Sequence, residues 1–316
     1  MNSQYDCIVI GGGPAGSTTA ALVAQSGHDV LQLEREAMPR QHVGESLMPE
    51  SYWIFQRLGV LDRLKKSPWS HKVGVQFVSD AGKESAPFFF RNHDPHESSQ
   101  TWHVDRAEFD QLLFENAASQ GATCLDRTRV VDVLFDGERA VGVKLQLPSG
   151  EVKQVSAQVI VDASGQQSLI ATKRGLRTVN PYLKKAAIWR HYRGAYRDEA
   201  GGGVKTVIMH TAEKKSWFWY IPQSNDVVSV GVVGDRDYLL KDRGGIEQVF
   251  HEEQQLCPTL CCWLHESEPV DELKVAKEFS YTTEQSAGDG WVLVGDAWGF
   301  IDPVYSSGVY FALKSG

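Results

Sequence analysis

The sequence lacks the features that several classes of protein require. Its five cysteines are odd in number, and the cluster at 257–262 has no second Cys/His pair nearby to complete a zinc site, so we expect reduced thiols and no metal. The histidines are scattered rather than paired at metal-ligand spacing. No apolar stretch reaches the roughly 18 to 20 residues that a membrane span needs, and the apolar start has no basic leader. We therefore expect a cytoplasmic protein without stable membrane insertion.

Positive charge is also scarce, because 32 Lys and Arg stand against 40 Asp and Glu and give a formal net charge of −8. Such a chain repels phosphate backbones, and no long basic run offsets the repulsion, so nucleic acid is not expected as a partner. What the chain does have is 316 residues, 42% of them hydrophobic and 23% charged. That is enough apolar material for one large domain or two ordinary ones.

The beginning of the chain carries a nucleotide-binding pattern. A β-branched apolar run at 5–10 is followed by GGGPAGS and then by Ala- and Leu-rich sequence, which predicts a strand, a glycine turn and a helix. Gly11, Gly13 and Gly16 fit GxGxxG, whose glycines allow a tight turn, the approach of a pyrophosphate and close helix packing. A second strand ends in Glu34, 23 residues after Gly11, where a carboxylate can accept hydrogen bonds from an adenosine ribose. The pattern predicts a dinucleotide site and leaves NAD and FAD both open.

Later segments continue the pattern. Residues 130–147 alternate like a β-hairpin, and QVIVDASGQQS predicts a further strand that ends in Asp162. Near the end, an expected strand at 291–294 is followed by Gly295 and Asp296. The segments GGGPAG, HVDRAEFDQLL, VDASG and VLVGDA resemble, in order and spacing, the FAD-binding motifs of the flavoprotein monooxygenase superfamily with the para-hydroxybenzoate hydroxylase fold. This resemblance spans nearly the whole chain.

The resemblance implies an α/β fold in which a Rossmann-like FAD-binding domain is interleaved with a mostly antiparallel β-sheet substrate domain. We expect residues 1–75, 100–180 and 275–316 to form the FAD-binding domain, and residues 76–99 and 181–274 to form the β-sheet domain. Members of the superfamily continue with a C-terminal helical segment, so we expect that segment to be missing from this chain.

The same resemblance implies which residues hold the cofactor. Glu34 would bind the adenosine ribose, and Arg106 would approach the ribose or the phosphates. Val130 would lie near the adenine, and Asp296 would hold the ribityl or pyrophosphate end. The expected cofactor-binding set is Gly11, Gly13, Pro14, Ala15, Gly16, Glu34, Arg35, Arg40, Glu45, Ser46, Arg106, Val130, Asp162, Gly165, Gly295, Asp296, Pro303, Gly308 and Val309.

Two further segments indicate the branch of the superfamily. RQHVGESLMPE, at 40–50, resembles the GES motif of flavin-dependent halogenases and of geranylgeranyl-reductase-like flavoproteins. SWFWYIP, at 216–222, matches WxWxIP, the signature of flavin-dependent halogenases, while prenyl reductases show a related aromatic-x-Trp-x-Phe-Pro. The segment alternates like a strand, so Trp217 and Trp219 share one face, where two stacked indoles would wall a flavin or substrate cavity.

By this resemblance the enzyme would oxidise chloride or bromide to hypohalous acid, which reaches the substrate by way of a lysine. In SHKVGVQF, Lys72 begins a sequence similar to the K-x-G-x-x-F of the halogenases. Burial lowers the pKa of an ammonium group, which would help Lys72 to donate to the oxidant or to be halogenated by it. Lys83 and Lys65 are the lesser candidates for this lysine.

The motif DPVYSSGV resembles the halide and flavin loop of the halogenases. Backbone N–H groups at Ser306, Ser307 and Gly308 stand where a helix is expected to begin, which suits a halide or a reduced flavin, although either serine also suits an ordinary N-cap. Tyr305 occupies the place where tryptophan halogenases carry a glutamate. This departure favours the branch that acts on phenols and pyrroles, free or tethered to a carrier protein.

We therefore interpret the sequence as that of an FAD-dependent halogenase. It would use reduced FAD from a separate flavin reductase, oxygen, and chloride or bromide to halogenate an electron-rich phenol or pyrrole, alone or on an acyl or peptidyl carrier protein. One alternative is a hydroxylase or geranylgeranyl-reductase-like oxidoreductase of the same superfamily. The other is a flavoprotein that binds FAD and has lost turnover.

Overall fold

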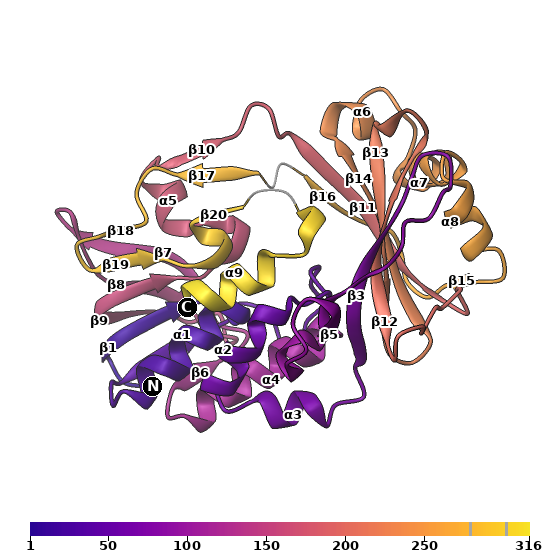
Figure 1. The fold of residues 1–316 in the computed structure, drawn as a ribbon. Coiled ribbons are helices and arrows are strands. Elements are labelled where there is room, and N and C mark those ends of the chain that lie inside the picture. Colours follow the sequence, from indigo (N-terminus) through magenta and orange to yellow (C-terminus); the bar gives the residue numbers. More distant parts are fainter. Residues whose placement is uncertain (278–279, 301–302) are drawn as a thin grey trace.

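The computed structural model describes residues 1–277, 280–300 and 303–316, and it contains two large sheets and a small one (Figure 1). The eight-stranded sheet is built around parallel strands in the order β19-β9-β1-β2-β6, with the β7-β8 hairpin joined to β9. Its strands are β1 Gln4–Ile10, β2 Val30–Leu33, β6 Thr123–Leu125, β7 Arg129–Asp136, β8 Arg139–Gln146, β9 Val152–Asp162, β18 Ala287–Gly288 and β19 Trp291–Leu293.

The nine-stranded sheet stands at the right of Figure 1 and is mostly antiparallel. The exception is β3, which runs parallel to β12 and antiparallel to β4 and β5. Its strands are β3 Ser70–Val78, β4 Phe88–Phe89, β5 Thr101–His103, β11 Lys185–Arg193, β12 Val204–His210, β13 Ser216–Pro222, β14 Val227–Asp235, β15 Glu268–Pro269 and β16 Lys274–Lys277. The small sheet contains β10 Arg177–Val179, β17 Tyr281–Thr283 and β20 Gly299–Phe300.

Helices cover one face of each large sheet. Alternate residues of β1 point to opposite faces, so that Val9 packs with α1, α4 and α9 while Ile8 packs under the β7-β8 hairpin. In the nine-stranded sheet, the face that carries Phe218 packs against α7 and α8. The helices are α1 Pro14–Gln25, α2 Tyr52–Arg57, α3 Leu61–Lys65, α4 Arg106–Ser119, α5 Leu169–Lys173, α6 Arg236–Leu240, α7 Ile246–Gln255, α8 Pro258–Trp263 and α9 Gly308–Ser315.

The expected α/β class, with a parallel sheet of the FAD-binding type and a mostly antiparallel second sheet, is confirmed. The sheets do not follow every residue range expected from the sequence, because β3 lies across the range limit at 75/76 and belongs with β5 to the nine-stranded sheet. Lys72, on β3, is therefore part of the nine-stranded sheet. Among the described residues, no helix is long and apolar enough to cross a membrane.

Candidate functional site

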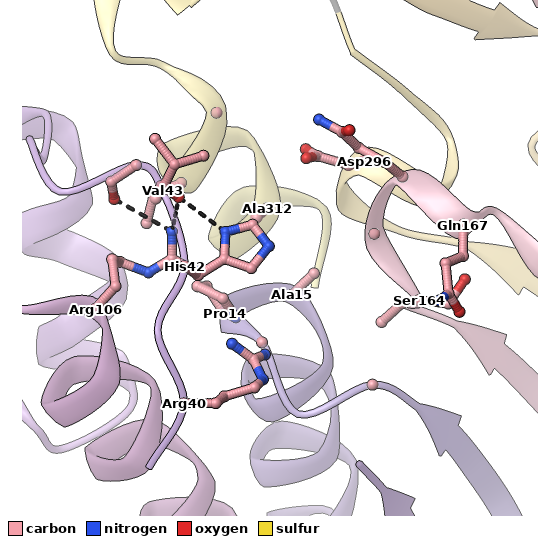
Figure 2. A pocket seen from close by; sticks show the side chains of 18 of the residues that line it. Pro14, Ala15, Arg40, His42, Val43, Arg106, Ser164, Gln167, Asp296 and Ala312 are labelled. Atoms are coloured by element: carbon pink, nitrogen blue, oxygen red, sulfur yellow. Dashed lines mark hydrogen bonds between the residues drawn. The ribbon is translucent and has the colours of Figure 1, made fainter. Parts of the chain in front are cut away.

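A pocket opens between the carboxyl ends of β1, β2 and β9 and the nine-stranded sheet. Figure 2 shows Pro14, Arg40, His42 and Arg106 on one side of it and Asp296 on the other. The residues expected from the sequence that line this pocket are Gly11, Gly13, Pro14, Ala15, Glu34, Arg35, Arg40, Glu45, Ser46, Arg106, Val130, Gly165, Trp217, Trp219, Asp296, Ser306, Gly308 and Val309.

Five other expected residues lie outside the pocket wall: Gly16, Lys72, Asp162, Gly295 and Ser307. Two of them support the wall from behind. A Cβ at Gly16 would lie 2.1 Å from the carbonyl oxygen of Gly11, so the glycine lets α1 pack closely on the turn. The carboxylate of Asp162 accepts hydrogen bonds from the backbone N–H groups of Ser164 in the following turn and of Ile170 in α5, which ties the end of β9 to that helix.

The glycine turn after β1 has the shape of a diphosphate cradle. Gly11 has φ of +117°, and a Cβ there would lie 2.3 Å from the carbonyl oxygen of Ala163. Gly13 faces the pocket, and among the described residues its Cβ would meet only the guanidinium of Arg40, at 3.4 Å. Pro14 then begins α1 without needing its missing N–H. The turn therefore fits an anion that approaches the start of α1.

A buried charge network lies beneath this cradle. Glu34 Oε2 accepts hydrogen bonds from Gly12 N at 2.8 Å and from Arg40 Nε at 3.2 Å. Arg40 also donates to Asp110, and Arg106 donates to both oxygens of the same carboxylate, at 2.8 and 3.0 Å. Burial lowers the pKa of Arg40, but the charges of Asp110 and Glu34 outweigh it and raise that pKa overall. Asp110 thus holds two arginines beside the pocket, a role that sequence reasoning missed although its i,i+4 spacing from Arg106 signalled the pair.

Arg106 also fixes the segment at 43–46, which contains the GES motif. Its Nη1 donates to the carbonyl oxygens of Val43 at 2.6 Å and Gly44 at 3.3 Å, and His42 Nδ1 lies 2.9 Å from the Val43 oxygen (Figure 2). Gly44 has φ of +105°, and a Cβ there would lie 2.9 Å from Arg106 Nη1. Most of the guanidinium is thus engaged with the protein itself, so Arg106 shapes the pocket wall as well as facing into it.

A chain of buried hydrogen bonds connects the GES motif with WxWxIP. His103 Nδ1 lies 2.7 Å from the Pro222 carbonyl oxygen, which can only accept, so this nitrogen carries the proton. Burial and the charge of Lys72 lower the pKa of His103 to about 3, so the ring is neutral and Nε2 accepts from Thr206 Oγ1 at 2.8 Å. Thr206 in turn accepts from Ser46 Oγ at 2.7 Å. Ser46 therefore offers lone pairs, and no proton, to the pocket.

Aromatic side chains of the nine-stranded sheet form the apolar wall. Trp217 and Trp219 both line the pocket, but the described ring contact is between Trp219 and Trp189, at 6.3 Å and tilted, rather than between the two residues of the motif. Gly231 stands between Trp219 and Trp189 in the β13-β14-β11 register. A Cβ at Gly231 would lie 2.2 Å from the Trp219 ring, so this glycine lets the two indoles meet across β14. Trp219 Nε1 is satisfied by Ser229 Oγ at 3.1 Å.

Lys72 lies just behind the pocket wall. Its side chain is buried in β3, and Nζ donates to the carbonyl oxygen of Leu47 at 2.9 Å, one residue after pocket-lining Ser46. Nζ also lies 5.4 Å from the centre of the Phe90 ring. Burial lowers the pKa of Lys72 to about 7, against a smaller opposing effect of Glu50. Ammonium and free amine are therefore both populated near neutral pH.

The lesser lysine candidates have other surroundings. Lys83 is exposed, and Lys65 is exposed and forms an ion pair with Glu97 at 3.0 Å. A second buried lysine, Lys205 on β12, was not expected from the sequence, and its ammonium is paired with Asp198. Of the lysines expected at the site, Lys72 alone combines burial with a position next to the GES segment.

The loop before α9 brings a polar group and backbone N–H groups to the pocket. Ser306, with φ of +55°, and Gly308 line the pocket, whereas Ser307 does not and makes no capping hydrogen bond with its side chain. Asp302 of the expected halide motif lies outside the described residues, and so does the side chain of Pro303. Of the three residues expected to bind a halide, Ser306 and Gly308 thus line the pocket and Ser307 does not.

Asp296 faces Arg106 across the pocket (Figure 2). Its carboxylate has no hydrogen-bond partner among the described residues, and burial raises its pKa to about 7, although the charge of Arg106 acts in the opposite direction. A carboxylate that lines a pocket without a partner fits a ligand that donates hydroxyl groups. Within the described part of the chain, no group of three His, Cys, Asp or Glu is placed to hold a metal ion.

Comparisons with known proteins agree on one family. A family model described as an FAD binding domain matches residues 4–314. The chain is 34% identical, over 99% of its length and 74% of the relative, to the 1H-pyrrole-2-carbonyl-[peptidyl-carrier protein] chlorinase of Pseudomonas fluorescens. It is 31% identical, over 99% of its length and 75% of the relative, to the corresponding brominase of Pseudoalteromonas luteoviolacea. Among solved structures, the myxobacterial chondrochloren halogenase, described as FAD-dependent, matches with a TM-score of 0.92 and 35% identity, over 99% of this chain and 72% of that one.

Proposed function

This chain belongs to the flavin-dependent halogenases of the FAD-binding domain family, and we propose that it halogenates a phenol or pyrrole ring that a carrier protein presents. The expectation of an FAD-dependent enzyme is confirmed by this membership. Two relatives are named for pyrrole-2-carbonyl groups on a peptidyl carrier protein, which supports the finer proposal. Tyr305 supports it too, because rings activated by their own OH or NH need less help from a catalytic carboxylate.

The pocket residues fit FAD along its length. Gly11 and Gly13 would receive the diphosphate at the start of α1, and Glu34 at the end of β2 would accept from the adenosine ribose. Val130 would lie near the adenine, and the unpartnered carboxylate of Asp296 would accept from ribityl hydroxyls. When bound in its reduced form, FAD would supply two electrons that reduce oxygen to the level of peroxide, which is the oxidant for the halide. We propose that a separate flavin reductase delivers this reduced FAD.

Lys72 carries the proposal of halogenation. It is a buried lysine with a pKa of about 7, one residue behind the pocket wall and next to aromatic side chains. Its amine form can take up halogen on Nζ, and its ammonium form can donate a hydrogen bond to the oxidant, so either form gives it a part in transfer to the ring. Trp217 and Trp219 would keep water from the same space. The backbone N–H groups near Ser306 and Gly308 would hold the halide.

The carrier proposal predicts a strong preference between substrates with the same ring. With reduced FAD and bromide supplied, kcat/KM for a pyrrole or phenol acid on its carrier protein should exceed that for the free acid about tenfold or more, because remote contacts with the carrier contribute to transition-state binding. Mass spectrometry of the carrier and of the free acid measures both rates. Equal rates would show that the protein acts on free rings, and unchanged activity with chemically reduced FAD in place of a reductase would show that no contact with the reductase is needed.

Asp296 gives a prediction for cofactor binding. Ribityl hydroxyls would stabilise its carboxylate form, and with a pKa of about 7 the neutral acid that is present at lower pH must first lose a proton. FAD affinity should therefore rise between about pH 6 and pH 8, by at most tenfold per pH unit, and Asp296→Asn should bind FAD about tenfold more weakly without that pH dependence. Fluorescence titration measures both. The exposed Asp289, paired with Arg139, provides the control variant Asp289→Asn, and a pH dependence that survives in Asp296→Asn would remove the assignment.

A further inference from the structure

His191 joins the pocket to the protein surface between two carboxylates. This residue lies on β11, and its Nε2 is 2.6 Å from Glu45 Oε1, while its Nδ1 is 2.8 Å from Asp271 Oδ2. The backbone N–H of His191 also donates to Asp271 Oδ1 at 2.8 Å, which fixes both oxygens of that carboxylate. Glu45 is the middle residue of the GES motif and lines the pocket.

The partners of His191 determine its protonation. Carboxylates only accept hydrogen bonds, so a ring held between two of them donates from both nitrogens and is an imidazolium. Burial by itself lowers the pKa of His191, but the hydrogen bonds and charges of Glu45 and Asp271 raise it to about 9. Lys274 on β16 also pairs with Asp271, and the residue opposite His191 on β14 is the uncharged Ser229. The proton is therefore present throughout the neutral pH range.

The three side chains differ in their access to water in the order that a proton path needs. The side chain of Asp271 is 28% exposed, that of His191 is 12% exposed, and that of Glu45 is 4% exposed. The line thus begins in solvent and ends on the wall of the pocket. An ion-pair clamp between the GES segment and the nine-stranded sheet would need no such order.

The proposed function creates a need for protons at the pocket, and the inference rests on it. Halogenation combines anionic reduced FAD, oxygen, a halide ion, the aromatic ring and two protons to give oxidised FAD, the halogenated ring and two water molecules. Two electrons pass to the oxygen from reduced FAD and two more from the halide, which becomes the halogen on the ring, and each turnover takes two protons from solvent into a pocket that is walled by indoles. The pocket therefore needs a proton donor that solvent can recharge.

We propose that Asp271, His191 and Glu45 form the path by which protons enter the flavin pocket. The Nε2 proton of His191 moves to Glu45, which hands it into the pocket, and the ring becomes neutral. Rotation of the side chain then brings the bare Nε2 to solvent beside Asp271, where it takes up a proton, and the return rotation restores the imidazolium beside Glu45. Glu45 touches the pocket, and His191 and Asp271 act through it.

The first test reads the protonation of His191 without any turnover. In FAD-free protein with ¹⁵N-labelled histidine, both ring nitrogens of His191 should be protonated at pH 7.5, with a midpoint near 9, and Asp271→Asn should lower that midpoint. The resonance is assigned by its loss in His191→Gln. A ring with one bare nitrogen at pH 7.5 would overturn the proposal.

The second test compares turnover with flavin binding. His191→Gln keeps a hydrogen-bonding side chain that cannot carry a proton, so halogenation should slow about ten- to hundredfold while the Kd for FAD stays within about threefold. Wild-type turnover should fall above about pH 9, the variant should lack that fall, and added imidazole should raise the rate of His191→Ala. His251→Gln, on the exposed side of α7, is the matched control. Weaker FAD binding with no pH change and no rescue would show a structural clamp and overturn the path.

Failure of the proposed function would be visible separately. If the wild-type protein makes no halogenated product with any ring, the halogenation proposal fails. The path is then tested by reoxidation of bound reduced FAD, since anionic reduced FAD, oxygen and one proton give oxidised FAD and hydrogen peroxide. Reoxidation that is slowed in His191→Gln and restored by imidazole in His191→Ala would support the path, and equal rates in wild type and His191→Gln would overturn it.

Discussion

Replacing Lys72 with methionine is expected to abolish halogenation while the protein still binds FAD and folds at least as stably as the wild type. Methionine matches the volume of the buried stem and removes the cost of burying an ammonium group. That cost appears as a fall in the pKa of Lys72 from 10.5 to about 7. A residue kept only for stability would show the opposite result, because its removal would weaken the fold.

The pH dependence of stability gives this prediction a second readout. Between pH 7 and 10.5 the unfolded chain keeps the Lys72 proton that the folded chain releases, so wild-type stability gains about 1.4 kcal/mol per pH unit from this group as pH rises. Lys72→Met should lose that gain, whereas Lys144→Met, at an exposed strand position, should keep both the gain and the activity. Thermal unfolding at pH 7 and pH 9 measures the difference. Halogenation that persists in Lys72→Met would remove the lysine assignment and leave the FAD assignment standing.

Removing Asp110 is expected to cause the largest loss of stability among single side chains at the site. Asp110→Ala would leave the buried guanidinium groups of Arg40 and Arg106 without the carboxylate that both share. Breaking a buried pair in this way costs about 3 to 5 kcal/mol of unfolding free energy. FAD binding should weaken as well, because Arg106 holds the carbonyl groups of Val43 and Gly44 at the wall.

A neighbour on the same helix provides the control for Asp110. Glu115 also lies on α4, but its ion pair with Arg63 is about half exposed and 3.6 Å long. Glu115→Ala should therefore change the free energy of unfolding by about 1 kcal/mol or less and leave FAD binding unchanged. Urea unfolding of the two variants gives the comparison. Similar small losses in both would mean that the two arginines find other partners when Asp110 is removed.

Much of the fold could be predicted from local patterns in the sequence. The strand, glycine turn and helix at the start are set by residues close together in the chain, and the structure has them as β1, Gly11 and α1. The parallel pairing of β3 with β12 was not predictable in the same way. It joins Lys72 to Val204 across more than a hundred residues of sequence and depends on how the second sheet closes.

Contacts between residues far apart in the sequence were even harder to predict at the site. Glu34 was predicted from its spacing after the glycine turn, Trp219 and Asp296 were identified by resemblance to a family, and all three line one pocket. The hydrogen-bond partners of two other motif residues come from distant segments. His191 is 146 residues from its partner Glu45, and Thr206 is 160 residues from its partner Ser46. A scattered histidine has no local signal when its partners lie on other strands. Which distant polar groups pair can be predicted only once the fold is known.

In the proposed function, the buried lysine and the FAD pocket serve to place a halogen on an aromatic ring. The most direct measurement is mass spectrometry of phenol and pyrrole acids, free and on a carrier protein, incubated with the protein, reduced FAD and oxygen, with and without bromide. We expect a bromine isotope doublet that requires bromide, the protein and Lys72. A product that gains only oxygen or hydrogen, or consumption of reduced FAD that yields hydrogen peroxide alone, would contradict it.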